Sequence, residues 1–387
     1  MRTRVAVIGA GPAGLLLSHM LHLAGIESVV LETRDRAYVE ARQRAGVVEH
    51  GVAELLQRVG LGERMEREGI VHNGIELRFS GNSHRVDFTD LCGRTVRVWA
   101  QTEIVKDLVA RRQADGGQIL FGARATAIEG AESDRPRVHF VHEGSQEVLE
   151  CDYVAACDGF HGIGRRSLPQ RVVRTFDRVH PFSWLGVLAE VAPSCEELIY
   201  ARNARGFALH SLRSEHVSRL YLQVPNDTDP TQWSDERIWD ELSERMALPG
   251  WELRRGPITD KSVTPMRSFV TEPMSHGRLY LAGDAAHIVP PTGAKGLNLA
   301  LNDVTLLAEA FASLYTHGDH GPLRDYSDTA LRRVWRAEHF SAWMTQLMHT
   351  SGDAFEDRLQ HAHLEFLASS RAASTQLAEN YTGIPHL

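Results

Sequence analysis

Three glycines and one acidic residue near the start of the chain have the types and spacing of a dinucleotide-binding site. Gly9, Gly11 and Gly14 follow the G-x-G-x-x-G pattern, and Glu32 ends the next apolar run. Such glycines allow a tight turn and a close approach of the backbone to a pyrophosphate, which the N–H groups of the following helix bind. The acid accepts hydrogen bonds from ribose hydroxyls. We therefore predict a bound adenine dinucleotide; the alternative is a tight strand–helix turn without a ligand.

Two aspartates follow strand-like runs and are expected near the same ligand. Asp158 stands before Gly159 at the end of the run YVAACDG, and Asp284 follows Gly283 after RLYLA. Asp284 could hold a sugar-like hydroxyl chain, and a helix expected from about Gly296 offers N–H groups that stabilise negative charge on a ring. Asp158 could fix a backbone turn near the cofactor.

A basic stretch follows Glu32 and contains Arg34, Arg36, Arg42 and Arg44. Arg42 and Arg44 lie two positions apart, so they do not share a helix face. One of them could bind a phosphate of the dinucleotide while the other faces outward. The alternative is a solvated, charged helix.

The spacing of apolar residues predicts the elements that position these side chains. Val5–Ile8, Leu15–Leu23 and Val29–Leu31 predict a strand, a helix and a second strand, which form the βαβ unit around the glycines. Alternating runs predict further, mostly antiparallel strands, over 69–99, 138–153 and 182–224. Further helices are predicted over 101–113, 234–246 and 323–367.

Composition excludes several classes of protein. The 387 residues are 43% hydrophobic and 24% charged, which is ordinary for a globular protein, and the net charge of −8 argues against a nucleic-acid partner. His19 and His22 interrupt the best candidate for a membrane span, and a strand by residue 5 leaves no room for a signal peptide. The four cysteines form no C-x-x-C pair, which favours a reducing cytoplasm and excludes disulfide-shuttling flavoenzymes. No metal site is predicted.

Three motifs in this order, GAGPAG with its acid, CDG and GDAAH, resemble the class A flavoprotein monooxygenases, whose resident cofactor is FAD. IVPPTGAKGLN, ELIYA, RGFALHS, TVRVWAQTE and ENYTGIP are similar to the para-hydroxybenzoate hydroxylase branch of that family, and the likeness extends over essentially the whole chain. The resemblance implies an α/β fold: a Rossmann-like FAD-binding domain, an inserted, mostly antiparallel β-sheet domain for the substrate, and a C-terminal helical region. Its implied parts are FAD-binding segments 1–72, 101–179 and 276–310, substrate-domain segments 73–100 and 180–275, and a C-terminal helical or interface region 311–387.

The resemblance also implies site residues. The positions that match the family's FAD site are Gly9, Gly11, Gly14, Glu32, Arg42, Arg44, Gln101, Asp284, Leu297 and Asn298. Those that match the substrate site are Ser211, Arg213 and Tyr221 for a carboxylate, Tyr200 and Tyr381 for a hydroxyl relay with His72 at its solvent end, the Pro291 carbonyl facing the substrate hydroxyl, and Thr292 beside it. Positions that match or adjoin those used for a visiting nicotinamide cofactor are Arg34, Tyr38, Arg42, Arg44, His161, Arg165 and Arg267.

The activity implied by the resemblance is the 3-hydroxylation of 4-hydroxybenzoate to 3,4-dihydroxybenzoate (protocatechuate). It uses O₂ and a reduced nicotinamide cofactor, and proceeds through a C4a-hydroperoxyflavin after the tyrosine relay has ionised the phenol in the positive field of Arg219. We expect NADPH to be the preferred nicotinamide cofactor, with NADH or the use of both as the alternatives. A homodimer is expected. The alternatives are the same chemistry on a 3-hydroxy-, 3,4-dihydroxy- or 4-aminobenzoate, and a flavin redox module that does not hydroxylate.

Overall fold

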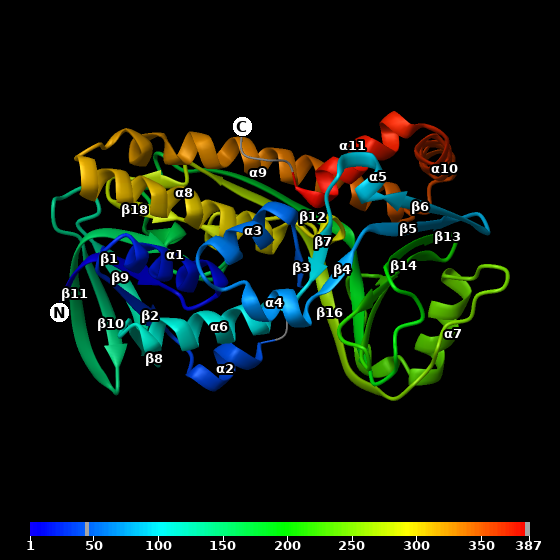
Figure 1. The fold of residues 1–387 in the computed structure, drawn as a ribbon, viewed down its shortest axis with the longest axis horizontal. Coiled ribbons are helices and arrows are strands. Elements are labelled where there is room, and N and C mark those ends of the chain that lie inside the picture. The colour runs from blue at the N-terminus through cyan, green and yellow to red at the C-terminus, as the bar shows by residue number, and fades with distance from the viewer. Residues whose placement is uncertain (43–45, 384–387) are drawn as a thin grey trace.

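The computed structural model describes residues 1–42 and 46–383, and its first sheet is built around the apolar run Val5–Ile8. These residues lie in β1 (Arg2–Ile8), which is flanked in parallel by β2 (Ser28–Glu32) and β11 (Ser145–Ala156) (Figure 1). A parallel strand covered on both faces is apolar throughout, and Val5–Ile8 are at most 4% exposed. The sheet is completed by β8 (Gln118–Phe121), β9 (Arg124–Glu129), β10 (Arg137–His142), β17 (Ser275–His276) and β18 (Leu279–Leu281).

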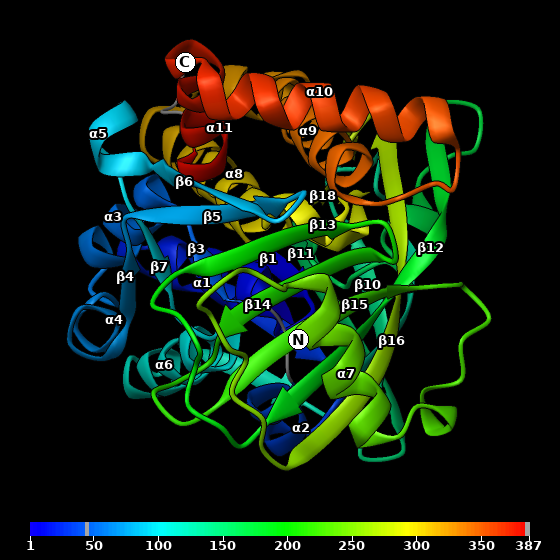
Figure 2. The same ribbon diagram turned by 90° about the vertical axis from the view of Figure 1, so that its right-hand side faces the viewer.

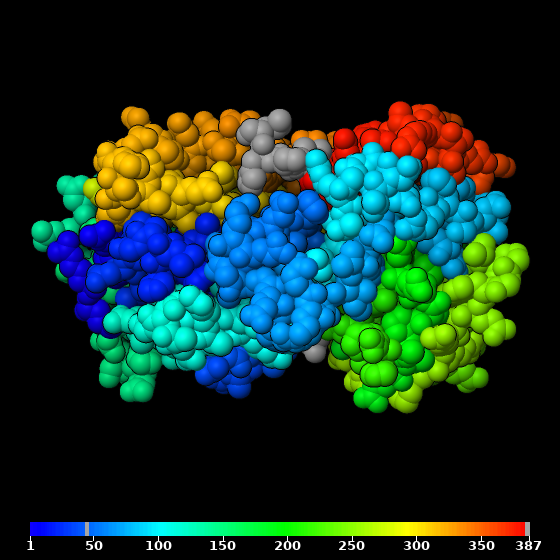
Figure 3. Space-filling model, in the orientation of Figure 1, coloured from blue at the N-terminus to red at the C-terminus, as the bar shows by residue number. Residues whose placement is uncertain are grey.

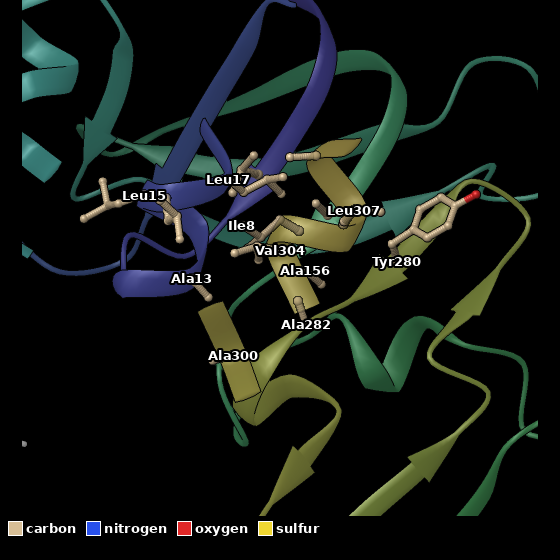
Figure 4. Packing of buried hydrophobic residues seen from close by; sticks show 14 of the residues in the cluster. Ile8, Ala13, Leu15, Leu17, Ala156, Tyr280, Ala282, Ala300, Val304 and Leu307 are labelled. Atoms are coloured by element: carbon tan, nitrogen blue, oxygen red, sulfur yellow. The ribbon is translucent and has the colours of Figure 1, made fainter. Parts of the chain in front are cut away.

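Long helices cover this sheet. α1 (Pro12–Leu23) lies between α6 (Gln101–Ala114) and α8 (Gly296–His317). Figure 4 shows Ala13 of α1 facing Ala300 of α8. Two small side chains at this crossing let the helices approach closely.

A second eight-stranded sheet has the order β19-β16-β12-β15-β14-β13-β5-β6. Its pairs are antiparallel except that β13 runs parallel to β5. Figure 2 views this sheet from the side opposite the first sheet. Its strands are β5 (Gly74–Phe79), β6 (Asn82–Asp87), β12 (Arg174–Ala189), β13 (Leu198–Asn203), β14 (Gly206–Leu212), β15 (Ser218–Val224), β16 (Ile258–Glu272) and β19 (His287–Ile288).

The two faces of this second sheet are covered by different helices. α7 (Asp235–Arg245), with Ser234 as its N-cap, packs on the outer face, as Ile238 and Leu242 contact the outer core cluster. The inner face packs against α9 (Gly321–Met348), which crosses both sheets, and against the chain that follows it (Figure 1).

The C-terminal region is not one helix, as the apolar pattern over 323–367 suggested. α9 ends at Met348 because His349 adopts an extended backbone conformation, and α10 (Ala354–Ser369) starts anew behind the Asp353 N-cap. α11 (Arg371–Thr382) then turns back and carries Tyr381 under the inner face. The short break therefore allows the last helix to reach the core under the second sheet.

Short elements link the two sheets, and the segment that contains α3 and α4 bridges them on the face seen in Figure 3. They are α2 (Arg36–Ala41), α3 (His50–Arg58), α4 (Glu63–Glu68), α5 (Phe88–Cys92) and a three-stranded sheet of β3 (Val47–Val48), β4 (Ile70–His72) and β7 (Val96–Val98). Of the helices within the described residues, none combines the length and apolarity that a bilayer crossing requires.

Candidate active site

The glycine loop between β1 and α1 is shaped by two glycines and left open at the third. Gly9 has φ +102°, and a Cβ there would lie 2.4 Å from the Cys157 carbonyl oxygen. A Cβ on Gly14 would lie 2.0 Å from the Gly9 carbonyl oxygen. A Cβ on Gly11 would meet no protein atom within 4 Å. Protein packing therefore explains Gly9 and Gly14, whereas the bare backbone at Gly11 fits the close approach of a pyrophosphate.

This contrast predicts different outcomes for two alanine substitutions. Gly14→Ala should destabilise the fold by about 1–3 kcal/mol or more, because its Cβ is forced into backbone. Gly11→Ala should leave the unfolding temperature of the apoprotein unchanged but weaken FAD binding at least about tenfold, equivalent to about 1.4 kcal/mol. Thermal unfolding of apoprotein and titration with FAD measure both effects. Unchanged FAD affinity in Gly11→Ala would move the pyrophosphate away from this loop.

Polar groups for the rest of an FAD surround the loop. Glu32 accepts hydrogen bonds from the backbone N–H groups of Ala10 (2.7 Å) and Arg34 (2.8 Å), which fix its carboxylate at the end of β2 with acceptor sites to spare for a ribose. Gln101 is the first residue of α6, and Arg42 is exposed just after α2. Asp284 is exposed in the turn that follows β18, and Arg44 lies outside the described residues.

The N-terminus of α8 adds backbone donors, while the side chain of Asn298 serves the fold. Leu297 and Asn298 lie in the first turn, whose N–H groups have no intrahelical partner. The Asn298 carboxamide accepts from the Glu49 N–H (2.9 Å) and donates to the carbonyls of Val47 (2.9 Å) and Ala294 (3.0 Å). Hence the matched FAD position at Asn298 can act through its backbone, and the side chain ties α8 to β3. The open loop, the fixed acid and these donors fit a bound FAD.

Strand alternation brings the expected substrate residues to one face of the second sheet. Tyr200 on β13 faces the inner core, whereas its neighbours Ile199 and Ala201 face α7. In register, Tyr200 stands opposite Leu209, and Leu209 opposite Tyr221. Successive side chains of a strand point to opposite faces, so every second residue of each strand points to the inner face. They are Trp184, Gly186, Tyr200, Phe207, Leu209, Ser211, Arg219 and Tyr221.

Two buried tyrosine hydroxyls form the centre of this face. The Tyr200 and Tyr381 hydroxyl oxygens are 2.8 Å apart, and Tyr200 Oη also lies 3.2 Å from the Thr292 carbonyl oxygen. Tyr200 carries one proton and has two acceptors for it, so its hydroxyl can turn between them. The partner carbonyl belongs to Thr292 rather than to Pro291, whose own carbonyl accepts the Ala294 N–H (2.9 Å).

Burial keeps both hydroxyls protonated. It raises the pKa of Tyr200 well above its usual value, and the neighbouring Tyr381 raises it further. Burial likewise raises the pKa of Tyr381, and the hydrogen bond with Tyr200 opposes this. A resting negative charge on either tyrosine is therefore unfavourable, so the pair is suited to passing protons on.

His72 is buried rather than on the solvent side. It lies in β4, is 0% exposed, and neither ring nitrogen has a hydrogen-bond partner among the described residues. Burial lowers the pKa of His72 to about 4. The imidazole is therefore neutral at pH 7, and a lasting positive charge on it is unfavourable.

Cationic groups gather at the other end of the inner face. The Arg219 guanidinium lies 5.3 Å from the centre of the Tyr221 ring, and its buried Nη1 has no partner among the described residues. Ser211 stands opposite Arg219 in register, and Arg213 follows in the hairpin turn, where it donates to the Thr102 hydroxyl (3.4 Å). Burial, and next the neighbouring Arg219, lower the pKa of Arg213, which means that an anion between them would relieve repulsion.

A buried lysine that the sequence analysis did not single out lies beside Tyr381. Lys295 is 4% exposed, and its Nζ donates to Glu49 Oε1 (2.6 Å) and to the Tyr381 carbonyl oxygen (2.9 Å). It lies 5.9 Å from the centre of the Tyr381 ring. The sequence signal that could have identified this lysine is its place in the short run GAKG, between small residues and outside any helix that would expose it to solvent.

The residues expected to meet a nicotinamide cofactor fall into two groups. Arg34 stacks over Tyr38 at 4.9 Å on the exposed helix α2. Arg165 and Arg267 lie 4.6 and 4.5 Å from the Phe160 ring centre, and Arg267 also pairs with Asp177 (2.8 Å). His161 is exposed next to that ring and packs edge-on against it.

Buried neutral histidines predict that acid destabilises the protein. Burial lowers the pKa of His72 and His210 to about 4 and that of His349 to about 3, whereas an unfolded histidine titrates near 6.5. Between about pH 6.5 and 4 the unfolded chain binds more protons than the folded protein. The free energy of unfolding therefore decreases as the pH is lowered, by about 1.4 kcal/mol per pH unit for each group. Burial opposes protonation of His287, but Asp303 outweighs it and raises that pKa, which offsets part of the loss. Urea unfolding at pH 7.5 and 5 should show lower stability at pH 5; equal stability would contradict these burials.

Within the described part of the chain, no group of three or more His, Cys, Asp or Glu side chains could hold a metal ion. All four cysteines are free thiols.

Comparison with known proteins agrees with this geometry. Residues 2–341 match a protein family described as "FAD binding domain". The chain is 46% identical, over its full length and 96% of the relative, to p-hydroxybenzoate hydroxylase from Acinetobacter baylyi. It is 28% identical over 81% of its length to 3-(3-hydroxy-phenyl)propionate/3-hydroxycinnamic acid hydroxylase from Burkholderia cenocepacia, of which it spans 57%.

The fold has solved counterparts. The crystal structure of p-nitrophenol 4-monooxygenase PnpA from Pseudomonas putida superposes with a TM-score of 0.86 over 99% of both chains, at 19% identity. The predicted fold class is confirmed, and the family match supports FAD as the cofactor. The chain belongs to the p-hydroxybenzoate hydroxylase family of FAD-dependent aromatic hydroxylases.

Proposed function

We propose that this protein hydroxylates 4-hydroxybenzoate at carbon 3 to give 3,4-dihydroxybenzoate, with O₂ and a reduced nicotinamide cofactor as co-substrates. The observation that carries this proposal is the buried Tyr200–Tyr381 hydroxyl pair, 2.8 Å apart, on the same sheet face as the cationic end at Arg219. One face thus offers proton acceptors for a phenol and donors for a carboxylate. The name of the 46% identical relative contains the same substrate.

At the phenol end, the substrate hydroxyl donates to Tyr200 Oη while Tyr200 passes its own proton to Tyr381. Both tyrosines remain protonated after the transfer, which accords with their raised pKa values. We propose that His72, whose ring nitrogens have no partner among the described residues, passes the proton on beyond Tyr381 without keeping it, and that the Thr292 carbonyl orients Tyr200. Ionisation makes the ring carbon next to the phenolate oxygen electron-rich, which selects carbon 3 for oxygen attack.

At the carboxylate end, Arg213 supplies the planar fork that matches a carboxylate, and the hydroxyls of Ser211 and Tyr221 complete the set of donors. Burial raises the pKa of Tyr221, and Arg219 and Arg213 oppose this, so its hydroxyl stays a donor. Arg219, at the same cationic end beside Tyr221, adds a positive field that stabilises the negative charge of the ionised substrate.

FAD, when bound, supplies the redox chemistry, accepting electrons from the nicotinamide and delivering one oxygen atom of O₂. The protein's part is to keep water from the reacting ring, because water favours loss of peroxide. Tyr200, Phe207 and Trp184 are at most 3% exposed and form the dry wall behind the substrate.

The test of this proposal is stopped-flow reduction of the holoenzyme by NADPH and NADH, with product analysis in the presence of O₂. We expect 4-hydroxybenzoate to accelerate reduction and to yield 3,4-dihydroxybenzoate. If it did neither, the assignment would fail, and 3-hydroxy- and 4-aminobenzoate, tested in parallel, would identify another substrate.

The structure around α2 supports NADPH as the preferred donor and yields a prediction. Arg36 is paired with Glu40 (2.6 Å), whereas the guanidinium of Arg34 lies exposed over Tyr38, where it could pair with a 2′-phosphate. Arg34→Ala should raise KM for NADPH about tenfold, the effect of losing about 1.4 kcal/mol, and leave KM for NADH within about twofold. Arg36→Ala is the matched control and should change neither as much. Equal effects on both cofactors would remove Arg34 from 2′-phosphate recognition.

We also propose a homodimer. Phe355, Leu359 and Phe366 share one face of α10 and are 71%, 51% and 55% exposed. An apolar stripe of this kind on the surface favours a protein contact. Light scattering of the holoenzyme, compared with a Phe355→Lys/Phe366→Lys variant, would detect a dimer and its loss; a monomeric wild-type protein would contradict it.

A further inference from the structure

A chain of aromatic rings in contact leads from the substrate face to His349, the buried C-cap residue of α9. Trp184 packs against Tyr221 (ring centres 4.8 Å apart) and against Phe207 (5.4 Å), and Phe207 in turn packs against Tyr200 (6.1 Å). Trp184 therefore supports a residue from each end of the substrate site.

The orientation of the Trp184 indole is fixed by one hydrogen bond. Its Nε1–H donates to His349 Nε2 at 2.7 Å, and both side chains are buried, 3% and 2% exposed. An indole N–H can only donate, so His349 Nε2 carries no proton. The other ring nitrogen, Nδ1, then carries the proton and donates to the Thr345 carbonyl oxygen at 2.8 Å. The imidazole is thus held in a single neutral tautomer.

Packing fixes the imidazole from its faces as well. Phe182 stacks on His349 with ring centres 4.4 Å apart and planes 5° from parallel, and Phe207 lies 4.5 Å away. Two directional hydrogen bonds and two ring contacts over-determine its position. An apolar side chain of the same size could fill this volume but could not set the rotation of the indole.

We propose that His349 is a positioning residue of the substrate site, which acts by holding the Trp184 indole against Tyr221 and Phe207. The inference deepens the proposed function and rests on it, because the site that Trp184 supports is the one assigned to 4-hydroxybenzoate. The side-chain contacts of His349 described above are with Trp184, Thr345, Phe182 and Phe207, so it acts on the site through Trp184. Its role is to keep the Tyr221 hydroxyl and the Tyr200 ring aimed at the substrate.

The test is a double-mutant cycle on the holoenzyme with the dissociation constant of 4-hydroxybenzoate, read from the flavin spectrum, as the measured quantity. His349→Phe keeps the ring but removes the acceptor, and Trp184→Phe removes the donor. We expect each variant to raise the dissociation constant about tenfold, and the double variant to raise it no further than Trp184→Phe alone. His349→Gln, which restores an acceptor oxygen, should recover part of the loss.

The matched control is His210→Phe, which removes a buried, hydrogen-bonded histidine of β14 that lies on the face towards α7. It should leave the dissociation constant within about twofold of wild type. If His349→Phe also stayed within twofold, or if the two pocket variants were additive, the positioning role would be wrong. If His349→Phe did not accumulate as folded holoenzyme, Trp184→Phe would decide: unchanged affinity there overturns the role.

A second measurement does not depend on the substrate. In protein labelled with ¹⁵N at tryptophan and histidine, the Trp184 indole resonance, assigned by its loss in Trp184→Phe, should show a nitrogen–nitrogen coupling across the hydrogen bond. Absence of that coupling would overturn the inference. If wild-type protein showed the coupling but bound no 4-hydroxybenzoate, the proposed function would fail on its own, and the cycle would be repeated with the aromatic acid that does bind.

Discussion

Tyr200→Phe is expected to form 3,4-dihydroxybenzoate at least about 100-fold more slowly than the wild type at saturating 4-hydroxybenzoate, since acid–base groups contribute about 10²- to 10⁴-fold. The phenyl ring keeps the packing against Phe207 and Tyr381, so the dissociation constant of the substrate should change by no more than about threefold. What is lost is the oxygen that receives the phenol proton 2.8 Å from Tyr381. NADPH oxidation would continue in part and release hydrogen peroxide instead of product.

The measurement is product formation by chromatography beside peroxide release and NADPH consumption. Tyr326→Phe is the matched control, because Tyr326 is equally buried and its hydroxyl donates to the Leu281 carbonyl (2.8 Å) outside the substrate face. That variant should lose stability but keep its ratio of product to NADPH consumed. Near-normal hydroxylation in Tyr200→Phe would remove the relay from the mechanism.

Arg213→Ala is expected to weaken 4-hydroxybenzoate binding by about 1.5–3 kcal/mol, or about 10- to 150-fold, the range for a hydrogen bond to a charged group. Arg213 lies in the hairpin turn between β14 and β15, next to Arg219, so its loss leaves the strands themselves paired. The effect should fall on the dissociation constant and KM more than on the rate of hydroxylation at saturation.

A neutral analogue makes this prediction specific. The wild type should bind 4-hydroxybenzoate far more tightly than 4-hydroxybenzamide, and Arg213→Ala should lose most of that preference. Arg205→Ala is the control. Arg205 is exposed in the preceding hairpin turn and pairs with Glu241, and this variant should keep the preference for 4-hydroxybenzoate. An unchanged preference in Arg213→Ala would place the carboxylate elsewhere.

The cofactor half of this protein was largely predictable because its signals are local. The run Val5–Ile8, the glycines and the apolar spacing of α1 specify a strand, a turn and a helix within some twenty positions. Gly11 indicates a ligand, because no protein atom lies close enough to require a glycine there. Strand alternation likewise put Tyr200 and Tyr221 on a common face once the strands were identified.

What could not be predicted depends on contacts between distant parts of the chain. The burial of His72, the use of the Asn298 carboxamide to bind Val47, and the Lys295–Glu49 pair each join segments whose pairing only the fold reveals. The break after α9 is of the same kind, because His349 leaves the helix to meet Trp184 across the sheet. The spacing of apolar residues alone predicts an uninterrupted helix across His349.

The long strand β16 takes part in all three apolar cores: Val270 packs with the dinucleotide-binding half, Met266 with the substrate face, and Val263 with the outer face under α7. Neither half can therefore come apart without exposing hydrocarbon in the other. Heating should thus unfold the protein in one cooperative calorimetric transition. A partly unfolded form that retains bound FAD while its second sheet is disordered should not accumulate.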